Sequence, residues 1–488
     1  MTLAPLTPAL LAALRPELSE GCERDISDAY LSEPRDLWRG VAGAILAPRD
    51  VEEVARIVRF AARERVGIVP WSGGTGLVGG QTLTEGPAPI VLSLERMSKV
   101  PAVYPRENVL VAEAGAILAD VHTAAAESDR LFPLSLASEG SARIGGLLAT
   151  NAGGVNVLRY GNARDLCFGI EAVLPDGSIM RGLKRLRKDN TGYDLRNLLI
   201  GAEGTLGVIT AAALRLFPQP VETGTAILTV AGPSAALDLL EMAERRGGVS
   251  AFELISGQGL RFLTETGLLS RLPFDEIPEW CVLVEIGAEA GGMVGERLET
   301  LFTEGYEAGL VTDGVVAQNA AQRAELWSIR ETIPEANRRV GAIVSSDISL
   351  PLSAIPDFLE SCDAKLATAD LRINAFGHLG DGNLHYNLFP PPGRSREEFA
   401  GQRAALRHII DEEVAAYDGS FSAEHGIGRL KVTQLQRYGD PAKLAAMRAI
   451  KKALDPVGIM NPGAVLGPEV RRNSPNFETG ASLTADAD

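Results

Sequence analysis

The chain has 488 residues, of which 45% are hydrophobic and 23% charged, so its composition is that of a globular protein rather than a disordered or fibrous one. Sixty-three acidic residues against 47 Lys and Arg give a formal net charge of −16, which disfavours nucleic acid and anionic lipid as partners. No run of about 18 apolar residues suggests a membrane span. Four widely spaced cysteines and an N-terminus without the basic start of a signal peptide predict buried free thiols in a cytoplasmic protein.

The predicted elements begin with a helix over residues 51–65, where apolar residues recur at helical spacing behind Asp50 as N-cap. Short apolar runs bounded by Gly or Pro predict buried strands. They lie at residues 66–70, 90–94 and 109–112. Prolines near residue 218 indicate a domain boundary. After it, we expect strands at residues 225–230, 251–255, 282–286, 371–376 and 384–388, and helices at residues 234–246, 294–308 and 396–416.

A glycine-rich loop follows the strand at residues 66–70. Residues 74–79 read G-x-G-x-x-G, and Glu95 lies about where a dinucleotide-binding unit has its ribose-binding acid. That unit requires a helix to begin on the loop, and the glycine and prolines at residues 86–89 leave no room for one. The alternatives that remain are an anion-binding loop built from backbone N–H groups and a turn without a ligand.

Two further segments rich in small residues, 133–161 and 201–209, follow in order. Together the three segments resemble the FAD-binding domain of the vanillyl-alcohol-oxidase superfamily, from about residue 34 to residue 218. The resemblance implies that residues 72–76 hold the pyrophosphate of FAD, that residues 133–161 run beside its ribityl chain and ring, and that Val208 and Ile209 touch its adenine end. Because no histidine lies in or beside residues 72–80, noncovalent FAD is expected. The residues expected to bind FAD are Pro70, Ser72, Gly73, Gly74, Thr75, Gly76, Gln81, Pro133, Ser138, Gly140, Ser141, Gly145, Gly146, Asn151, Gly153, Gly154, Tyr160, Gly161, Glu203, Val208, Ile209 and Asn461.

A fourth glycine cluster carries two histidines, His378 and His385, seven residues apart. The glycines between them favour a strand, a tight turn and a second strand, on which His385 and Asn387 share a face. Glu424 comes about forty residues later, at an expected strand-to-helix turn. Two His and one Glu are the ligands of an open, catalytic zinc-type site, although a structural role is the alternative for any single histidine. For His122 and His408, on predicted helices, the structural role is expected.

With the motifs at residues 327–331 and 461–463, this cluster resembles the branch that contains D-2-hydroxyglutarate, D-lactate and glycolate dehydrogenases, the first most closely. The resemblance implies that His378, His385 and Glu424 bind a divalent metal, with zinc expected. It also implies that His425 is the catalytic base. Asn387 would then meet the substrate's α-carboxylate and Arg330 its other carboxylate.

Three departures from the closest branch affect the second carboxylate. Pro334 stands where those enzymes have a substrate-binding threonine, Ser345 where they have a lysine, and Ala464 replaces the lysine usual after Asn-Pro-Gly. For Arg330, a salt bridge to a neighbour such as Glu331 or Glu335 is the structural alternative.

The expected fold class is α+β: a two-part FAD-binding domain of the vanillyl-alcohol-oxidase type and an α+β substrate (cap) domain with an antiparallel sheet. The expected parts are an N-terminal arm (1–33), the FAD-binding domain (34–218), the substrate domain with the metal site (219–460), a segment returning to the flavin (461–466) and a disordered tail (467–488).

The predicted function is an FAD- and metal-dependent dehydrogenase of a D-2-hydroxy acid resembling 2-hydroxyglutarate. Oxidation of the alcohol sends a hydride from C2 to flavin N5, while His425 takes the hydroxyl proton and the metal polarises that hydroxyl. An electron-transfer flavoprotein or a quinone is the expected acceptor, and a homodimer is left open. The alternatives are a D-lactate or glycolate dehydrogenase or oxidase and a non-catalytic flavin-binding subunit.

Overall fold

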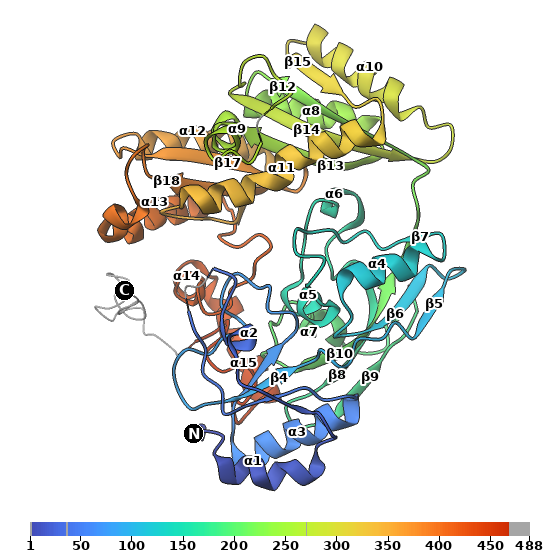
Figure 1. Cartoon of the computed structure of the whole chain (residues 1–488), viewed down its shortest axis with the longest axis vertical. Helices are drawn as coiled ribbons and strands as arrows, with labels where there is room; N and C mark the ends of the chain where they lie inside the picture. The colour runs from blue at the N-terminus through green and yellow to red at the C-terminus, as the bar shows by residue number, and fades with distance from the viewer. Residues whose placement is uncertain (1, 36–37, 270, 468–488) are drawn as a thin grey trace. The chain divides into compact units, whose positions relative to one another are not determined.

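A computed structural model describes residues 2–35, 38–269 and 271–467 (Figure 1). The expected disordered tail therefore lies outside the described residues, apart from Gly467. The chain forms two compact units: unit 1 comprises residues 1–153, 162–219 and 424–488, and unit 2 comprises residues 154–161 and 220–423. Within the described part of the chain, no helix has the length and apolar character needed to cross a membrane.

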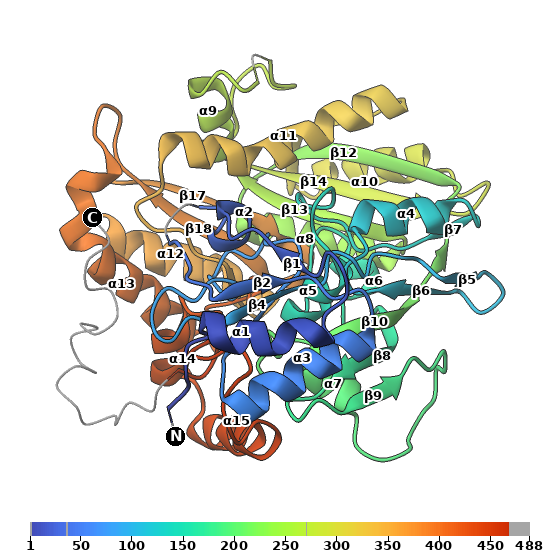
Figure 2. The ribbon, with the colours of Figure 1, turned by 60° about the horizontal axis from the view of Figure 1, so that its bottom comes forward.

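Unit 1 begins with a small sheet and the helices beside it. Its elements are α1 (Pro8–Leu14), β1 (Glu23–Arg24), α2 (Asp28–Leu31), β2 (Ala44–Leu46), α3 (Val51–Glu64), β3 (Ile68–Trp71) and β4 (Ile90–Ser93). The strand order is β1-β2-β4-β3, with β2 and β3 both parallel to β4. Asp50 caps α3 through the N–H of Glu53, as predicted. Figure 2 shows α1 beside α3.

Glu53 on α3 is a buried carboxylate that fastens the N-terminal segment. It accepts backbone N–H bonds from Ser19 and Arg49. Burial alone would raise the pKa of this carboxyl, but these donors outweigh burial and lower that pKa below its ordinary value. The segment expected to be an arm is thus packed into unit 1, and Leu14 is fully buried in its core.

The second sheet of unit 1 is antiparallel, with the order β5-β6-β10-β8-β9. Its strands are β5 (Ala102–Tyr104), β6 (Val109–Glu113), β8 (Cys167–Val173), β9 (Ile179–Gly182) and β10 (Val208–Arg215). The accompanying elements are α4 (Leu118–Ala126), β7 (Arg130–Leu131), α5 (Ile144–Thr150), α7 (Leu195–Leu199) and β11 (Phe217–Pro218). The predicted strands at residues 66–70, 90–94 and 109–112 correspond to β3, β4 and β6.

The last segment of the chain returns to unit 1. It contains α14 (Val432–Tyr438) and α15 (Pro441–Leu454). Ile68 of β3 donates its N–H to Ile459 and accepts one from Asn461, so this segment continues the hydrogen bonding of the first sheet. Residues 424–460, expected in the substrate domain, therefore belong to unit 1.

Unit 2 is built on one antiparallel sheet with the order β15-β12-β14-β13-β17-β18-β16. Its strands are β12 (Glu222–Val230), β13 (Val249–Ser256), β14 (Trp280–Ala288), β15 (Val311–Val316), β16 (Ile348–Ser349), β17 (Arg372–His378) and β18 (Asn383–Phe389). Alternating residues of these strands feed two separate apolar cores, one on each face of the sheet.

Helices cover both faces of this sheet. One face packs against α8 (Pro233–Arg245), α10 (Val294–Glu307), α12 (Ile355–Leu366) and α13 (Arg403–Ala416). The other packs against α9 (Gly257–Glu265) and the long α11 (Ala320–Val340), seen in the upper part of Figure 2. The helix predicted over residues 396–416 is two elements, because residues 396–402 form a tighter 3₁₀ turn before α13. The α+β class with an antiparallel sheet in the second unit is confirmed.

Candidate functional site

The glycine loop after β3 presents unpaired backbone donors. Within the described residues, the N–H groups of Gly73, Gly74, Thr75 and Gly76 find no acceptor. The amide of Gln81 instead donates to the carbonyls of Gly74 at 3.2 Å and Gly76 at 2.8 Å. With the carbonyls of Gly74 and Gly76 held by Gln81 and these N–H groups unpaired, the loop has the chemistry of an anion nest, which fits the diphosphate of a dinucleotide. As predicted, the loop contains no helix.

The second small-residue segment lies against this loop. A Cβ on Gly73, whose φ is +90°, would lie 2.6 Å from the carbonyl oxygen of Ser141, and a Cβ on Gly146 would lie 2.8 Å from that of Ser72. Only glycine permits two backbones this close. The two predicted cofactor segments are therefore brought together in unit 1.

The third segment joins the first to the last segment of unit 1, which begins at Glu424. The buried carboxylate of Glu203 accepts the N–H groups of Ile427 and Gly428, each at 2.7 Å. The amide of Asn461 donates to the carbonyl oxygens of Gly80 at 3.0 Å and Glu203 at 2.8 Å. Burial raises the pKa of the Glu203 carboxyl, and the two N–H donors oppose that rise.

Arg429 ties the same region to the glycine loop. Its guanidinium donates to the carbonyls of Gly79 and Gly80 and to Asn461 Oδ1, all within 2.9 Å. Burial lowers the pKa of Arg429 to about 10. These contacts fix the backbone immediately after His425.

Glu424 and His425 are the first residues of the last segment of unit 1. Their side chains lie 3.8 Å apart, from Glu424 Oε1 to His425 Nε2. The predicted strand-to-helix turn is wrong here, because Ser420 forms only an isolated bridge with Ser349 and α14 does not begin until Val432. The connection is an irregular loop held by side-chain hydrogen bonds rather than by a strand.

The other predicted FAD residues of unit 1 lie in or beside these segments or at the start of β10. They are Pro70, Pro133, Ser138, Gly140, Gly145, Asn151, Gly153, Val208 and Ile209. Gly154, Tyr160 and Gly161 belong instead to unit 2, where α6 (Val157–Tyr160) packs against β13. Arg159 holds this short helix by donating to the carbonyls of Gly248 and Gly287.

In unit 2, the predicted metal-binding histidines meet on one face of the sheet. β17 and β18 pair so that Phe376 is opposite His385, and strand alternation puts His378 on the same face. The two imidazole centroids are 6.0 Å apart, and one nitrogen of each ring lies within 4.8 Å of one of the other. Two imidazoles at this separation fit as ligands of one metal ion.

Arg330 of α11 reaches the same face. Its Nε donates to Glu253 Oε2 at 2.6 Å, and the other oxygen of that carboxylate lies 2.6 Å from His378 Nδ1. The salt bridge predicted as the structural alternative thus exists, but its partner is Glu253 of β13, not Glu331. Burial alone would raise the pKa of the Glu253 carboxyl. The charges and hydrogen bonds of His378 and Arg330 outweigh burial and hold that pKa well below its ordinary value.

Asn387 also lies on this face, with its amide oriented by the neighbouring loop. Its Oδ1 accepts the N–H of Ser346 at 3.1 Å. The opposite end of the amide, Nδ2, is a donor, which is what a carboxylate ligand requires. Arg407 of α13 donates to the carbonyl of Ser345 at 2.8 Å, so a guanidinium lies beside this residue.

The prediction of buried free cysteines is confirmed, and the two remaining histidines contact neighbouring residues. His122 on α4 bonds the carbonyl of Leu134 at 2.8 Å, and His408 on α13 pairs with Glu412 at 3.6 Å. All four cysteines are free and buried.

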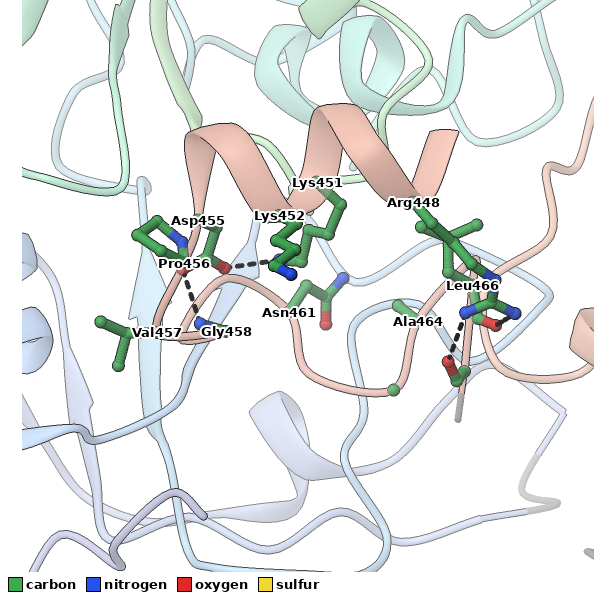
Figure 3. A pocket seen from close by; sticks show the side chains of 12 residues that line it. Arg448, Lys451, Lys452, Asp455, Pro456, Val457, Gly458, Asn461, Ala464 and Leu466 are labelled. Carbon is green, nitrogen blue, oxygen red and sulfur yellow. Dashed lines mark hydrogen bonds and ion pairs between the residues drawn. The ribbon is translucent and has the colours of Figure 1, made fainter. Parts of the chain in front are cut away.

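A hollow of about 300 Å³ lies between α15 and the segment after it, and Asn461 and Ala464 are among its lining residues (Figure 3). Two cationic side chains that line it already have hydrogen-bond partners. Lys451 donates to Thr205, Asp455 and Met460, and Arg448 donates to backbone carbonyls at the end of the described chain. These cations hold together the last turn of unit 1 that the structure describes.

Two family models match the chain. Residues 42–182 match an FAD binding domain, and residues 219–465 match the C-terminal domain of FAD linked oxidases. The chain belongs to the FAD-linked oxidase family. An FAD-linked oxidase is an oxidoreductase that carries FAD, and the glycine loop of unit 1 has unpaired backbone donors that could bind its diphosphate.

Among curated relatives of this FAD-linked oxidase, the D-2-hydroxyglutarate dehydrogenase of Xanthomonas citri is 36% identical over 470 residues, covering 95% of this chain and 96% of the relative. The mitochondrial D-2-hydroxyglutarate dehydrogenase of Bos taurus is 37% identical over 457 residues, covering 91% and 82%. Among solved structures, p-cresol methylhydroxylase matches with a TM-score of 0.73 at 18% identity, over 96% of this chain and 99% of that one. Alkyldihydroxyacetonephosphate synthase matches with a TM-score of 0.71 at 16% identity, over 95% and 86%. The last two show a shared fold.

Sequence reasoning missed Glu253 and Arg429. The sequence could have pointed to both residues. Glu253 is a lone charge in an apolar strand, and Arg429 directly follows Gly426-Ile427-Gly428. A buried charge needs a partner, so each position was a sign of an unrecognised ion pair or carbonyl cluster.

Proposed function

We propose that this FAD-linked oxidase is a divalent-metal-dependent dehydrogenase that oxidises a D-2-hydroxy acid, with 2-hydroxyglutarate-like acids preferred. The observation that carries the proposal is the set of side chains on one face of the unit 2 sheet. Two imidazoles, an amide donor and a buried arginine on one surface offer a metal and two carboxylates the groups each requires. The relatives named D-2-hydroxyglutarate dehydrogenase support the same substrate class.

The third proposed metal ligand is Glu424. Glu424 directly follows Ala423, which belongs to unit 2. Ala423 donates its N–H to the carbonyl of Asp347 at 3.3 Å within that unit, and this bond, one residue before Glu424, supports the assignment. Zinc is the proposed metal, since two histidines and one carboxylate are a catalytic zinc ligand set that leaves a position for substrate.

The chemistry assigned to the protein's own groups is binding and proton transfer. When bound, FAD supplies a hydride acceptor at N5, and the metal supplies a Lewis acid for the alcohol. Asn387 donates its amide to the α-carboxylate. The two Nη groups of Arg330 hold the far carboxylate, because its Nε is occupied by Glu253. His425 accepts the hydroxyl proton, since a neutral imidazole has one ring nitrogen that accepts a proton.

The test is anaerobic reduction of the purified holoenzyme. Bleaching of the flavin colour by D-2-hydroxyglutarate, and not by its L enantiomer, is the expected result. His378→Ala and His385→Ala should keep their FAD, lose bound metal and lose activity by orders of magnitude, because Lewis-acid stabilisation is worth several kcal/mol. The matched control is His408→Ala on α13, which should stay active. Full activity in a protein shown metal-free by elemental analysis would remove the metal from the proposal.

A D-lactate-like substrate is the second candidate. Two residues favour it. Pro334 and Ser345 stand where the related enzymes are expected to have a threonine and a lysine, so the second carboxylate of a dicarboxylate substrate would lose at least one contact here. Arg330→Ala should therefore raise KM for the dicarboxylate far more than for D-lactate. Equal changes for both acids would favour the monocarboxylate.

The remaining proposals are that FAD is held noncovalently, that electrons pass to an electron-transfer flavoprotein or a quinone, and that the protein is cytoplasmic. Whether it forms a homodimer is left open. Free buried cysteines agree with a reducing compartment. Size-exclusion chromatography with light scattering tests the assembly, and reoxidation of the reduced flavin by quinone analogues or by a purified electron-transfer flavoprotein tests the acceptor.

A further inference from the structure

Glu253 is a fully buried carboxylate shared by two residues of the proposed site. Its two oxygens have different partners: Oε1 lies 2.6 Å from His378 Nδ1, and Oε2 accepts from Arg330 Nε at 2.6 Å. All three residues belong to unit 2. One carboxylate thus connects a proposed metal ligand to the proposed carboxylate clamp.

The fold dictates this arrangement. β13 and β17 pair antiparallel with Glu253 directly opposite His378, so the two side chains leave the same face of the sheet. α11 covers that face, and the Arg330 guanidinium lies over the Phe376 ring, 4.8 Å from its centroid. Water is excluded from the carboxylate, so the histidine and the arginine are the partners that satisfy it.

The carboxylate fixes which atoms of its partners remain for ligands. An ionised carboxylate only accepts hydrogen bonds, so His378 must carry a proton on Nδ1 and present Nε2 to a metal. Arg330 has its Nε engaged, which leaves its two Nη groups to grip a carboxylate with parallel hydrogen bonds.

We propose that Glu253 is the positioning residue that sets both the metal-binding tautomer of His378 and the substrate-facing edge of Arg330. Metal affinity and recognition of the far carboxylate then depend on one side chain. This inference rests on the proposed function and adds to it a residue that touches neither metal nor substrate.

The test compares Glu253→Gln with a matched control, Glu413→Gln. Glu413 is also a buried carboxylate of unit 2 with a cationic partner, Lys365, and neither contacts His378 or Arg330. FAD-loaded protein is equilibrated with zinc over a graded series of chelator concentrations, and bound zinc is measured by elemental analysis. Glu253→Gln should lose half of its zinc at a free chelator concentration about ten- to a hundredfold lower than wild type does, as is typical when a metal ligand loses its hydrogen-bond partner. Glu413→Gln should match wild type.

The second measurement is the KM for D-2-hydroxyglutarate divided by that for D-lactate, with zinc in excess. A residue that merely stabilised the fold would change both values alike. Glu253→Gln should raise the ratio about tenfold or more, because a misplaced guanidinium weakens only the far carboxylate. If either zinc retention or the KM ratio of Glu253→Gln equals that of wild type, the proposal is overturned.

Two further results keep these outcomes separable. If Glu253→Gln fails to fold, Glu253→Asp replaces it, because a carboxylate shorter by one methylene cannot keep both 2.6 Å contacts and must change at least one measurement. No change in that variant overturns the proposal. A wild-type protein that neither retains zinc nor oxidises a 2-hydroxy acid refutes the proposed function itself, and the positioning role falls with it.

Discussion

Replacing Glu203 with Gln removes the charge that joins the third glycine segment to the segment after His425, while it keeps the size of the side chain. Glu203 is 8% exposed and accepts two N–H groups, those of Ile427 and Gly428, each at 2.7 Å. A hydrogen bond to a charged group is worth about 1.5–3 kcal/mol and a neutral one about 0.5–1.5 kcal/mol. The amide keeps one accepting oxygen but turns an NH₂ group toward the other donor. One bond is therefore weakened and one is lost, for a cost of about 3 kcal/mol.

The assay is thermal release of FAD, followed by the flavin fluorescence that appears as the cofactor leaves unit 1. In a domain of this size, about 3 kcal/mol corresponds to a fall of about 6–12 °C in the release temperature. Glu413→Gln, which alters a buried carboxylate of unit 2, should leave the release temperature unchanged. A Glu203→Gln protein that releases FAD within about 2 °C of wild type would show that this carboxylate does not stabilise unit 1.

Three other predictions concern unit 1. Acid precipitation should release all of the flavin into the supernatant, and flavin that stays in the pellet would contradict noncovalent binding. Gly146→Ala should lower FAD affinity, since its Cβ would lie 2.8 Å from a backbone oxygen, whereas Gly401→Ala meets nothing within 4 Å and should bind FAD normally, as titration would show. Because the pKa of Glu53 lies below its ordinary value of 4.5, its stabilisation is present above that pH and is lost as the pH falls through the lowered pKa. The Tm gap between wild type and Glu53→Gln should thus close on acidification, while exposed Glu52→Gln shows little gap at any pH.

Much of the fold follows from local pattern. Apolar spacing behind Asp50 predicts α3, and apolar runs between turn residues predict β12, β13, β14, β17 and β18 of the unit 2 sheet, because these signals depend on neighbours in sequence. The same is true of the shared face of His385 and Asn387, which strand alternation alone requires. The remaining strands of the unit 2 sheet, β15 and β16, were not predicted. The absence of a helix on the first glycine loop follows from the prolines that come after it.

The rest depends on contacts between distant residues. Glu253 contacts Arg330, which follows it by 77 residues, and His378, which follows it by 125 residues. No pattern of neighbouring residues predicts either contact. The nearby glutamates of α11 were the better guess for Arg330 by sequence, but Glu335 is engaged by Arg338 and Arg339 on its own helix. Likewise, the return of residues 424–460 to unit 1 depends on Glu203 and Arg429, whose partners are set by tertiary structure.

The division of unit 1 into three stretches of chain bears on how the protein is made. Unit 2 lies almost entirely within residues 220–423, whereas unit 1 needs residues 424–467 to supply the backbone bonds to Ile68 and to Glu203. During synthesis, the first 219 residues emerge with that carboxylate unpaired and must wait for some two hundred more before its partners exist. Unit 2 can close as an insertion in the meantime, because its strands pair only with one another. A nascent chain whose residue 423 has just left the ribosomal exit tunnel could thus have a complete unit 2 sheet while unit 1 still lacks its last segment. FAD binding is expected to follow once that segment emerges.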